Sequence, residues 1–211
     1  MAQAQSVTSF VMTAELPWPD DSPAADRLGV LDRVSLYESG KPTPCTVRRI
    51  SPLGATLRGA GSRTVGEQVA VELPTGQRAA GTVDWISAEE AGVRFKQPID
   101  MVALLNRKLL EETAERRKMP RVELRCHVGV KWGIDLAAAT LRNISARGLQ
   151  IQGDGLPPRD TFVSLFIDGL NVPAGEVVWA KDDVAGIELM DEISWSSLMP
   201  WIRDQHRSAA A

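Results

Sequence analysis

The sequence predicts a mainly β protein made of two small six-stranded antiparallel β-barrels, each followed by an α-helix. Three observations lead to this prediction: an internal repeat, about six short apolar segments in each repeat, and an amphipathic segment at the end of each. Short strands joined by tight turns favour a closed barrel, because closure leaves no strand edge exposed.

The internal repeat appears when the chain is shifted by 94 residues, which aligns 27–104 with 121–198 without a gap. Eighteen of the 78 aligned positions are identical, whereas composition alone would give about five. The matches include Ile50, Ser51, Gly54, Gly81, Val83 and Trp85 with Ile144, Ser145, Gly148, Gly175, Val177 and Trp179. We therefore expect two copies of one domain, each with its own core and with its tryptophan in that core.

The expected strands are apolar or alternating segments bounded by Gly, Pro and Asp. They cover 28–37, 45–50, 54–58, 68–73, 79–86 and 92–96 in the first copy, and 122–132, 139–144, 148–152, 162–167, 174–181 and 184–190 in the second. Apolar residues at helical spacing predict helices over 101–115 and 195–203, each covering its own barrel. The predicted domains are a disordered or loosely packed segment 1–24, a first domain 25–114 and a second domain 115–211.

Composition excludes several classes of protein. The 211 residues are 44% apolar and 24% charged, with a net charge of −3, which is typical of a globular protein and argues against binding to a nucleic-acid polymer. No signal peptide or membrane-length apolar stretch is recognisable, so we expect a cytoplasmic protein without membrane insertion. Two cysteines and two histidines predict neither a disulfide framework nor a metal site. No phosphate loop or nucleophile–base constellation is present, so we expect no catalytic residues, no cofactor and no enzyme.

Two short motifs in the second copy carry the chemistry. The first is the basic arm from Arg116 to Arg121, in which Pro120 opposes regular structure and guanidinium groups can bind phosphate or a guanine edge. The second is Asn143-x-Ser145-x-x-Gly148, which offers polar atoms and a glycine that permits a tight turn and a close ligand approach. Either motif alone is more often a solvated linker or an ordinary turn.

Together the two motifs resemble the PilZ domain family. Arg117-x-x-x-Arg121 is followed, after about twenty residues, by the Asn-x-Ser-x-x-Gly turn within a six-strand pattern. The resemblance implies a small β-barrel that binds cyclic di-GMP, a bacterial second messenger. It assigns the phosphate and guanine contacts of the arm to Arg117 and Arg121, and the hold on one guanine to Asn143, Ser145 and Gly148. Arg116 is expected to hold a second, stacked cyclic di-GMP, and Lys118 and Arg147 are candidates for additional contacts.

The first copy departs from this pattern. Pro23 stands at the position of Arg117, and Arg49 stands at the position of Asn143. Pro52 and Leu53 lie between the retained serine and glycine of the turn. One lost arm arginine removes a charge-assisted contact worth about 1.5–3 kcal/mol. We therefore expect the first copy, a degenerate PilZ-like domain, to serve structure or partner docking and not to bind cyclic di-GMP.

The resulting functional hypothesis is a cyclic di-GMP receptor that signals to an unidentified downstream protein. Binding would order the arm and reorient the two domains, which supplies a differential affinity for the partner. The alternative is a PilZ-like protein-interaction adaptor that binds no nucleotide, because a fold by itself does not fix a function.

Overall fold

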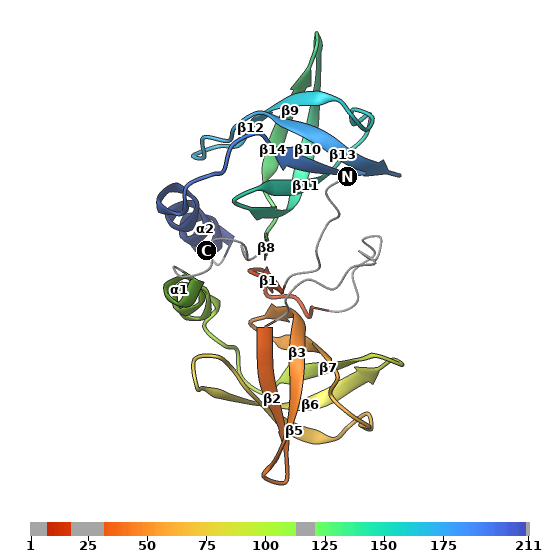
Figure 1. Ribbon diagram of the computed structural model, residues 1–211, viewed down its shortest axis with the longest axis vertical. Helices are drawn as coiled ribbons and strands as arrows, with labels where there is room; N and C mark the ends of the chain where they lie inside the picture. Colours follow the sequence, from red (N-terminus) through yellow and green to blue (C-terminus); the bar gives the residue numbers. More distant parts are fainter. Residues whose placement is uncertain (1–7, 18–31, 113–120, 210–211) are drawn as a thin grey trace. The chain divides into compact units, whose positions relative to one another are not determined.

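The structure, a computed structural model, describes residues 8–17, 32–112 and 121–209 (Figure 1). The chain separates into two compact units, with the division between residues 120 and 121. The C-terminal unit contains the two motifs' described residues, and the N-terminal unit contains the residues that align with them.

The C-terminal unit is a closed antiparallel barrel followed by a helix. Its elements are β8 (Arg121–Glu123), β9 (His127–Trp132), β10 (Asp135–Ser145), β11 (Gly148–Gln152), β12 (Phe162–Phe166), β13 (Gly175–Lys181), β14 (Val184–Leu189) and α2 (Trp195–Ala209). The pairings run β9–β10–β11–β14–β13–β12 and return to β9. The predicted six-stranded barrel with a C-terminal helix is thus confirmed for this unit, and β8 is an additional strand beside β10.

One predicted strand of this unit is wrong in its extent. The segment 122–132 is divided into β8 and β9, which pair with different parts of β10. Val122 pairs with Ile144 near the end of β10, whereas Trp132 pairs with Asp135 at its beginning. The break at 124–126 lies opposite Leu141 and Arg142, where the register of β10 with β11 shifts, so the irregularity of β10 interrupts the pairing on its other edge as well.

In its described residues, 8–17 and 32–112, the N-terminal unit contains seven strands and a helix. They are β1 (Ser9–Val11), β2 (Asp32–Glu38), β3 (Lys41–Ser51), β4 (Gly54–Arg58), β5 (Gln68–Glu72), β6 (Arg78–Ile86), β7 (Glu90–Phe95) and α1 (Met101–Glu112). The strands β2 to β7 pair antiparallel in the order β3–β2–β5–β6–β7–β4, and β4 also pairs with β3. These strands belong to one sheet, to which β1 adds a parallel pairing with β3.

Strand β1 lies in the segment 1–24, for which we expected disorder or loose packing. Ser9 pairs with Arg49 and Phe10 pairs with Ile50. Phe10, Val11 and Met12 are buried. A run of three apolar residues is too short to stand out in the sequence, and only its pairing with a distant strand makes it regular structure.

Most elements of the two units correspond under the 94-residue shift. The bounds of β3, β4, β5 and β7 coincide with those of β10, β11, β12 and β14, and both helices begin at equivalent residues. The irregularities agree as well: the register shifts at 47/49 and 83/85 recur at 141/143 and 177/179. The repeat in the sequence therefore corresponds to a repeat in local structure.

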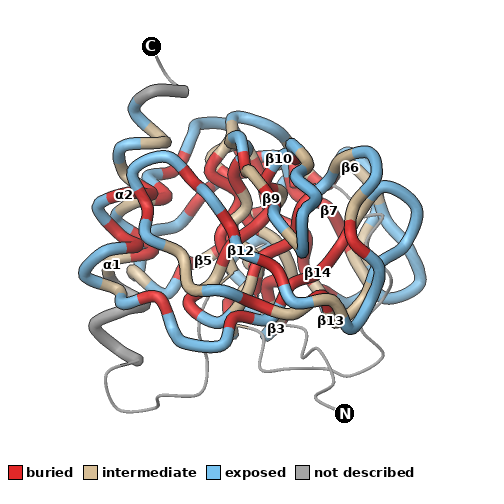
Figure 2. The backbone as a smooth tube through the Cα atoms, turned by 90° about the horizontal axis from the view of Figure 1, so that it is seen from above, coloured by how far each residue is buried: buried red, intermediate tan, exposed pale blue. Residues whose placement is uncertain are grey.

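Buried and exposed residues alternate along the strands, as Figure 2 shows by its red and pale blue segments. In β12 the buried residues Val163 and Leu165 alternate with exposed ones, and β2, β5 and β9 follow the same pattern. The tryptophans depart from the expectation of a core position. Trp85 and Trp179 are half-buried, and each lies against a glycine of the neighbouring strand directly after a register shift. The shift turns each ring out of the inward-facing row.

The two helices differ from their predicted lengths. Helix α1 ends at Glu112, and the remaining predicted residues 113–115 lie outside the described part. Helix α2 continues beyond the predicted residue 203, with Pro200 inside it. Trp201 of α2 donates a hydrogen bond from Nε1 to the backbone oxygen of Asp168, 2.8 Å away, in the loop that follows β12. Neither of the described helices is long and apolar enough to span a bilayer.

Candidate functional site

The hairpin between β10 and β11 forms the centre of the predicted site. Ser145 pairs with Gly148, and the two residues between them make the turn. The Ser145 hydroxyl donates to the Gly148 backbone oxygen at 3.1 Å. The turn's own carbonyl oxygens accept hydrogen bonds from Leu189 N at 2.9 Å and Ile193 N at 2.8 Å. The Ser145–Gly148 pairing, the hydrogen bond of the Ser145 hydroxyl and the two bonds to the turn carbonyls hold this turn in place. Its polar atoms are therefore positioned before any ligand arrives.

Gly148 is needed for a different reason from the one that its place in a turn suggests. It is not among the glycines with positive φ, so the turn does not require glycine's conformational freedom. A Cβ added at Gly148 would lie 2.6 Å from the backbone oxygen of Ile187 in β14. The expectation of a turn glycine is therefore corrected: close packing of the neighbouring strand excludes any side chain here.

Asn143 lies in β10, two residues before Ser145, and is buried at 7% exposure. Its Nδ2 donates to Oε1 of Gln150 in β11, the residue with which it pairs across the hairpin. Gln150 is also buried, at 6% exposure. Gln150 is not among the residues that the motif predicts. A polar residue between the apolar Leu149 and Ile151 is the only sequence signal that could have indicated it.

Arg121 is brought to the same end of the hairpin by β8. Val122 pairs with Ile144, so Arg121 is the next residue along β8 toward the Ser145 end of β10. Its side chain is half-buried and already interacts within the protein. The other predicted arm residues, Arg116, Arg117 and Lys118, lie outside the described residues. The described geometry thus joins one arm arginine with the Asn-Ser-Gly motif.

Two further arginines lie beside the motif. Arg147, at the tip of the turn, has its guanidinium paired with Glu192, with Nε 2.6 Å from Oε1. Arg142 is half-buried at the register shift next to Asn143 and is not among the predicted contacts. The equivalent Arg48 in the N-terminal unit pairs with Glu90 at 3.3 Å, whereas the residue equivalent to Glu90 in the C-terminal unit is Val184. The position equivalent to Glu90 thus carries no carboxylate in the C-terminal unit, where Arg142 has an interaction of its own within the protein.

The equivalent hairpin of the N-terminal unit keeps the framework and changes the side chains. The carbonyls of Pro52 and Leu53 accept from Ile99 N and Phe95 N at 3.0 and 2.8 Å, in the same places as their counterparts. Arg49 and Thr56 replace the Asn143–Gln150 pair. The N-terminal hairpin therefore keeps the backbone hydrogen bonds of the C-terminal hairpin but not its polar side chains.

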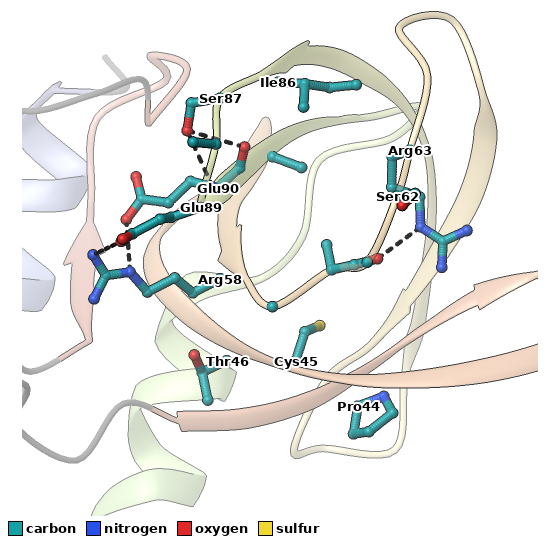
Figure 3. A pocket seen from close by; sticks show the side chains of 15 residues that line it. Pro44, Cys45, Thr46, Arg58, Ser62, Arg63, Ile86, Ser87, Glu89 and Glu90 are labelled. Carbon is teal, nitrogen blue, oxygen red and sulfur yellow. Dashed lines mark hydrogen bonds and ion pairs between the residues drawn. The ribbon is translucent and has the colours of Figure 1, made fainter.

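A hollow of about 1120 Å³ lies elsewhere on the N-terminal unit (Figure 3). Its cations are already neutralised, because Arg58 reaches Glu89 at 2.9 Å and Glu90 at 3.3 Å. Arg63 likewise reaches Glu67 at 2.9 Å. An anionic ligand would have to displace these carboxylates, so the hollow does not suit a phosphate-bearing molecule.

The two cysteine thiols are not suited to act as nucleophiles at neutral pH. Burial raises the pKa of Cys45 to about 11, and burial likewise raises the pKa of Cys126 to about 11. Both are free thiols, and a thiol protonated at neutral pH is a poor nucleophile. Among the described residues, no three His, Cys, Asp or Glu side chains gather in a way that could hold a metal ion.

The family model described as the PilZ domain matches residues 115–198. A PilZ domain is thus found at residues 115–198. The matched residues include both predicted motifs and the whole β10–β11 hairpin, and they end within α2. The matched segment does not include the described strands of the N-terminal unit.

Solved structures similar to the chain share little sequence with it. A Borreliella burgdorferi PlzA protein in complex with c-di-GMP is 11% identical, with 83% of this chain and 87% of that chain covered and a TM-score of 0.32. The Bacillus subtilis inhibitor of motility (MotI/DgrA) is 14% identical, with coverages of 87% and 98% and a TM-score of 0.34. YcgR in complex with c-di-GMP from Escherichia coli is 12% identical, with coverages of 84% and 85% and a TM-score of 0.30. No curated protein matches the chain significantly. TM-scores this low say nothing about what this chain binds.

Proposed function

We propose that the protein is a cyclic di-GMP receptor that binds the dinucleotide through its PilZ domain and is not an enzyme. The observation that carries the proposal is the PilZ match over both motifs. The positions of Arg121, Ser145 and Gly148 at adjoining ends of β8, β10 and β11 support it. A guanidinium near fixed hydroxyl and backbone groups suits a ligand that has both phosphates and guanine edges.

The residues take different roles in this proposal. Arg117 and Arg121 contact the phosphates and a guanine, and Arg116 holds a second, stacked ligand. Ser145 and the backbone at Gly148 meet a guanine from the barrel side. Asn143 is buried and bonded to Gln150, so we assign it the positioning of this strand end together with its contact to the ligand.

We further propose that the N-terminal unit is a degenerate second copy of the same barrel and binds no cyclic di-GMP. The coincident strand bounds and register shifts support a common origin of the two units. Arg49 in place of Asn143 and Pro23 in place of Arg117 remove two of the contacts. Binding is therefore confined to the PilZ domain.

A protein partner is the second part of the proposal. Phe162 and Phe166 on the outward side of β12 are 62% and 56% exposed, and aromatic side chains in such positions are typical of protein interfaces. The equivalent residues of the N-terminal unit are Gln68 and Glu72, which are bonded to Thr82 and Arg78. The exposed face of β12 also favours the alternative function, in which the protein is an interaction adaptor that binds no nucleotide.

The signal is proposed to arise from ordering of the arm and reorientation of the two units. Solution scattering with and without saturating cyclic di-GMP tests this step by itself. A changed profile is expected. An unchanged profile would remove the reorientation and leave ligand binding intact.

Calorimetric titration with cyclic di-GMP tests the binding site. We expect micromolar or tighter binding by the full chain and loss of binding in the Arg117→Ala/Arg121→Ala variant. A matched control is Arg159→Ala/Arg207→Ala, which removes two exposed arginines that pair with Asp160 and Asp204 and should bind as the parent does. Two ligands per chain would support the role of Arg116, and one ligand per chain would contradict it. No binding by folded protein would favour the adaptor.

A further inference from the structure

The two units add an extra strand to the same place in different ways. In the C-terminal unit, β8 pairs antiparallel with Asn143 and Ile144 of β10. In the N-terminal unit, β1 pairs parallel with Arg49 and Ile50 of β3, which are the equivalent residues. One edge of a strand accepts one neighbour, so β1 takes the position on β3 that corresponds to the position of β8 on β10.

Hydrogen bonds from side chains fix the segment Thr8–Pro17 at both of its ends. The Thr8 hydroxyl donates to Val47 O at 2.7 Å and accepts from Asp32 N at 2.8 Å. At the other end, the Thr56 hydroxyl donates to the backbone oxygen of Pro17. Thr8 and Thr56 are both buried, so these bonds are shielded from water and costly to leave unmade.

The segment also covers the hairpin glycine of this unit. The Leu16 side chain, through Cδ2, lies 3.4 Å from the position that a Cβ on Gly54 would take. Gly54 is equivalent to Gly148, and Thr56 is equivalent to Gln150. The residues that the segment contacts therefore correspond to Asn143, Ile144, Gly148 and Gln150 of the C-terminal unit.

We infer that this surface of the N-terminal unit is a peptide-binding site, and that its resident ligand is the chain's own segment Thr8–Pro17. The site accepts an extended strand with a buried hydroxyl at its start, an apolar run in the middle and a backbone oxygen at its end. Described residues of the segment include no cation, so the site holds its ligand through strand pairing and apolar burial. Occupied in this way, the surface is closed to any other ligand. This inference does not depend on nucleotide binding by the PilZ domain.

The test uses the full chain with a protease recognition sequence inserted between Pro19 and Asp20. After cleavage at micromolar concentration, we expect the N-terminal fragment to co-elute with the rest of the protein on size exclusion. A fluorescent peptide of residues 6–17 should then exchange into the site, with one peptide per chain and a saturable anisotropy change. A fragment that separates at once, together with no peptide binding, would overturn the inference.

Peptide variants locate the contact without altering the protein. A peptide with Thr8→Val should bind about tenfold more weakly, because it loses both bonds of a buried hydroxyl. A peptide with Thr13→Val is the matched control, because the Thr13 hydroxyl donates to Glu15 of the same segment. Equal affinity of the two variants would contradict the proposed site.

Protein variants place the site on the N-terminal unit. Thr56→Val should lower the affinity of the protein for the unmodified peptide by about three- to tenfold. Thr82→Val, at a half-buried threonine that accepts from Gln68, should leave the affinity unchanged. A titration of the same cleaved protein with cyclic di-GMP keeps the two questions apart, because the peptide result stands whether or not the nucleotide binds.

Discussion

The N-terminal and C-terminal units share a framework but not a surface. Four pairs of equivalent strands have the same bounds, equivalent turn carbonyls accept the same backbone hydrogen bonds, and register shifts fall at equivalent residues. The polar pair Asn143–Gln150 is nevertheless replaced by Arg49 and Thr56, and the extra strand runs in the opposite sense. Glycines and apolar residues therefore maintain the fold, while a few polar positions on it are free to acquire or lose a ligand.

The largest expected effect tests the shared framework. Gly186→Ala would place a Cβ 2.1 Å from Nε1 of Trp179, and Gly92→Ala would place one 2.0 Å from Nε1 of Trp85. Each change should lower the free energy of unfolding of its own unit by about 3 kcal/mol, because the tryptophan must leave its place. Urea denaturation followed by tryptophan fluorescence measures both. A small loss for one variant and a large loss for the other would break the comparison.

The thiols should behave alike in the two units. With the pKa of Cys45 and of Cys126 each raised to about 11 by burial, the reactive thiolate at pH 8 should be roughly a hundredfold scarcer than in a solvated cysteine. The rate of alkylation by iodoacetamide should rise tenfold per pH unit up to about pH 11, because the folded state retains the proton. Mass spectrometry of each cysteine peptide gives the rates. Rapid reaction of one thiol at pH 8 would show that its burial is transient.

The two units should differ in how much each contributes to the binding of cyclic di-GMP. Arg121→Ala should lower the affinity for cyclic di-GMP by about 10- to 100-fold, since it removes one charge-assisted contact. Arg27→Ala, at the aligned position of the first copy, should change the affinity by less than about twofold. Calorimetry measures both variants. A comparable loss from Arg27→Ala would mean that the N-terminal unit contributes to binding.

The smallest expected effect concerns Arg147. Its guanidinium pairs with Glu192, and both side chains are well exposed, so Arg147→Gln should lower the free energy of unfolding by less than about 1 kcal/mol. The affinity for cyclic di-GMP should fall by less than about fivefold, because the free protein already uses this cation. Chemical denaturation and calorimetry provide the two numbers. A loss of affinity beyond tenfold would show that Arg147 leaves Glu192 for the ligand.

Much of the site could be predicted because it depends on residues that are close together in the sequence. Ser145 and Gly148 at the ends of a two-residue turn follow from the spacing of the motif, and the six-strand pattern follows from alternating apolar residues. The reason for Gly148 could not be predicted, because the Ile187 oxygen that excludes a side chain comes from a strand almost forty residues later. The Glu192 partner of Arg147 was inaccessible for the same reason. Gln150 lies close to the motif in sequence, but only the pairing of β10 with β11 shows that it bonds to Asn143.

The sequence by itself determined the repeat, the type and order of most strands, and the two motifs, because each depends on neighbouring residues or on a fixed offset. The tertiary structure alone decided that 122–132 is divided into β8 and β9, and that Thr8–Pro17 contains a strand. A strand of three residues has no pattern of its own, and its backbone hydrogen bonds exist only when a distant strand supplies the partners.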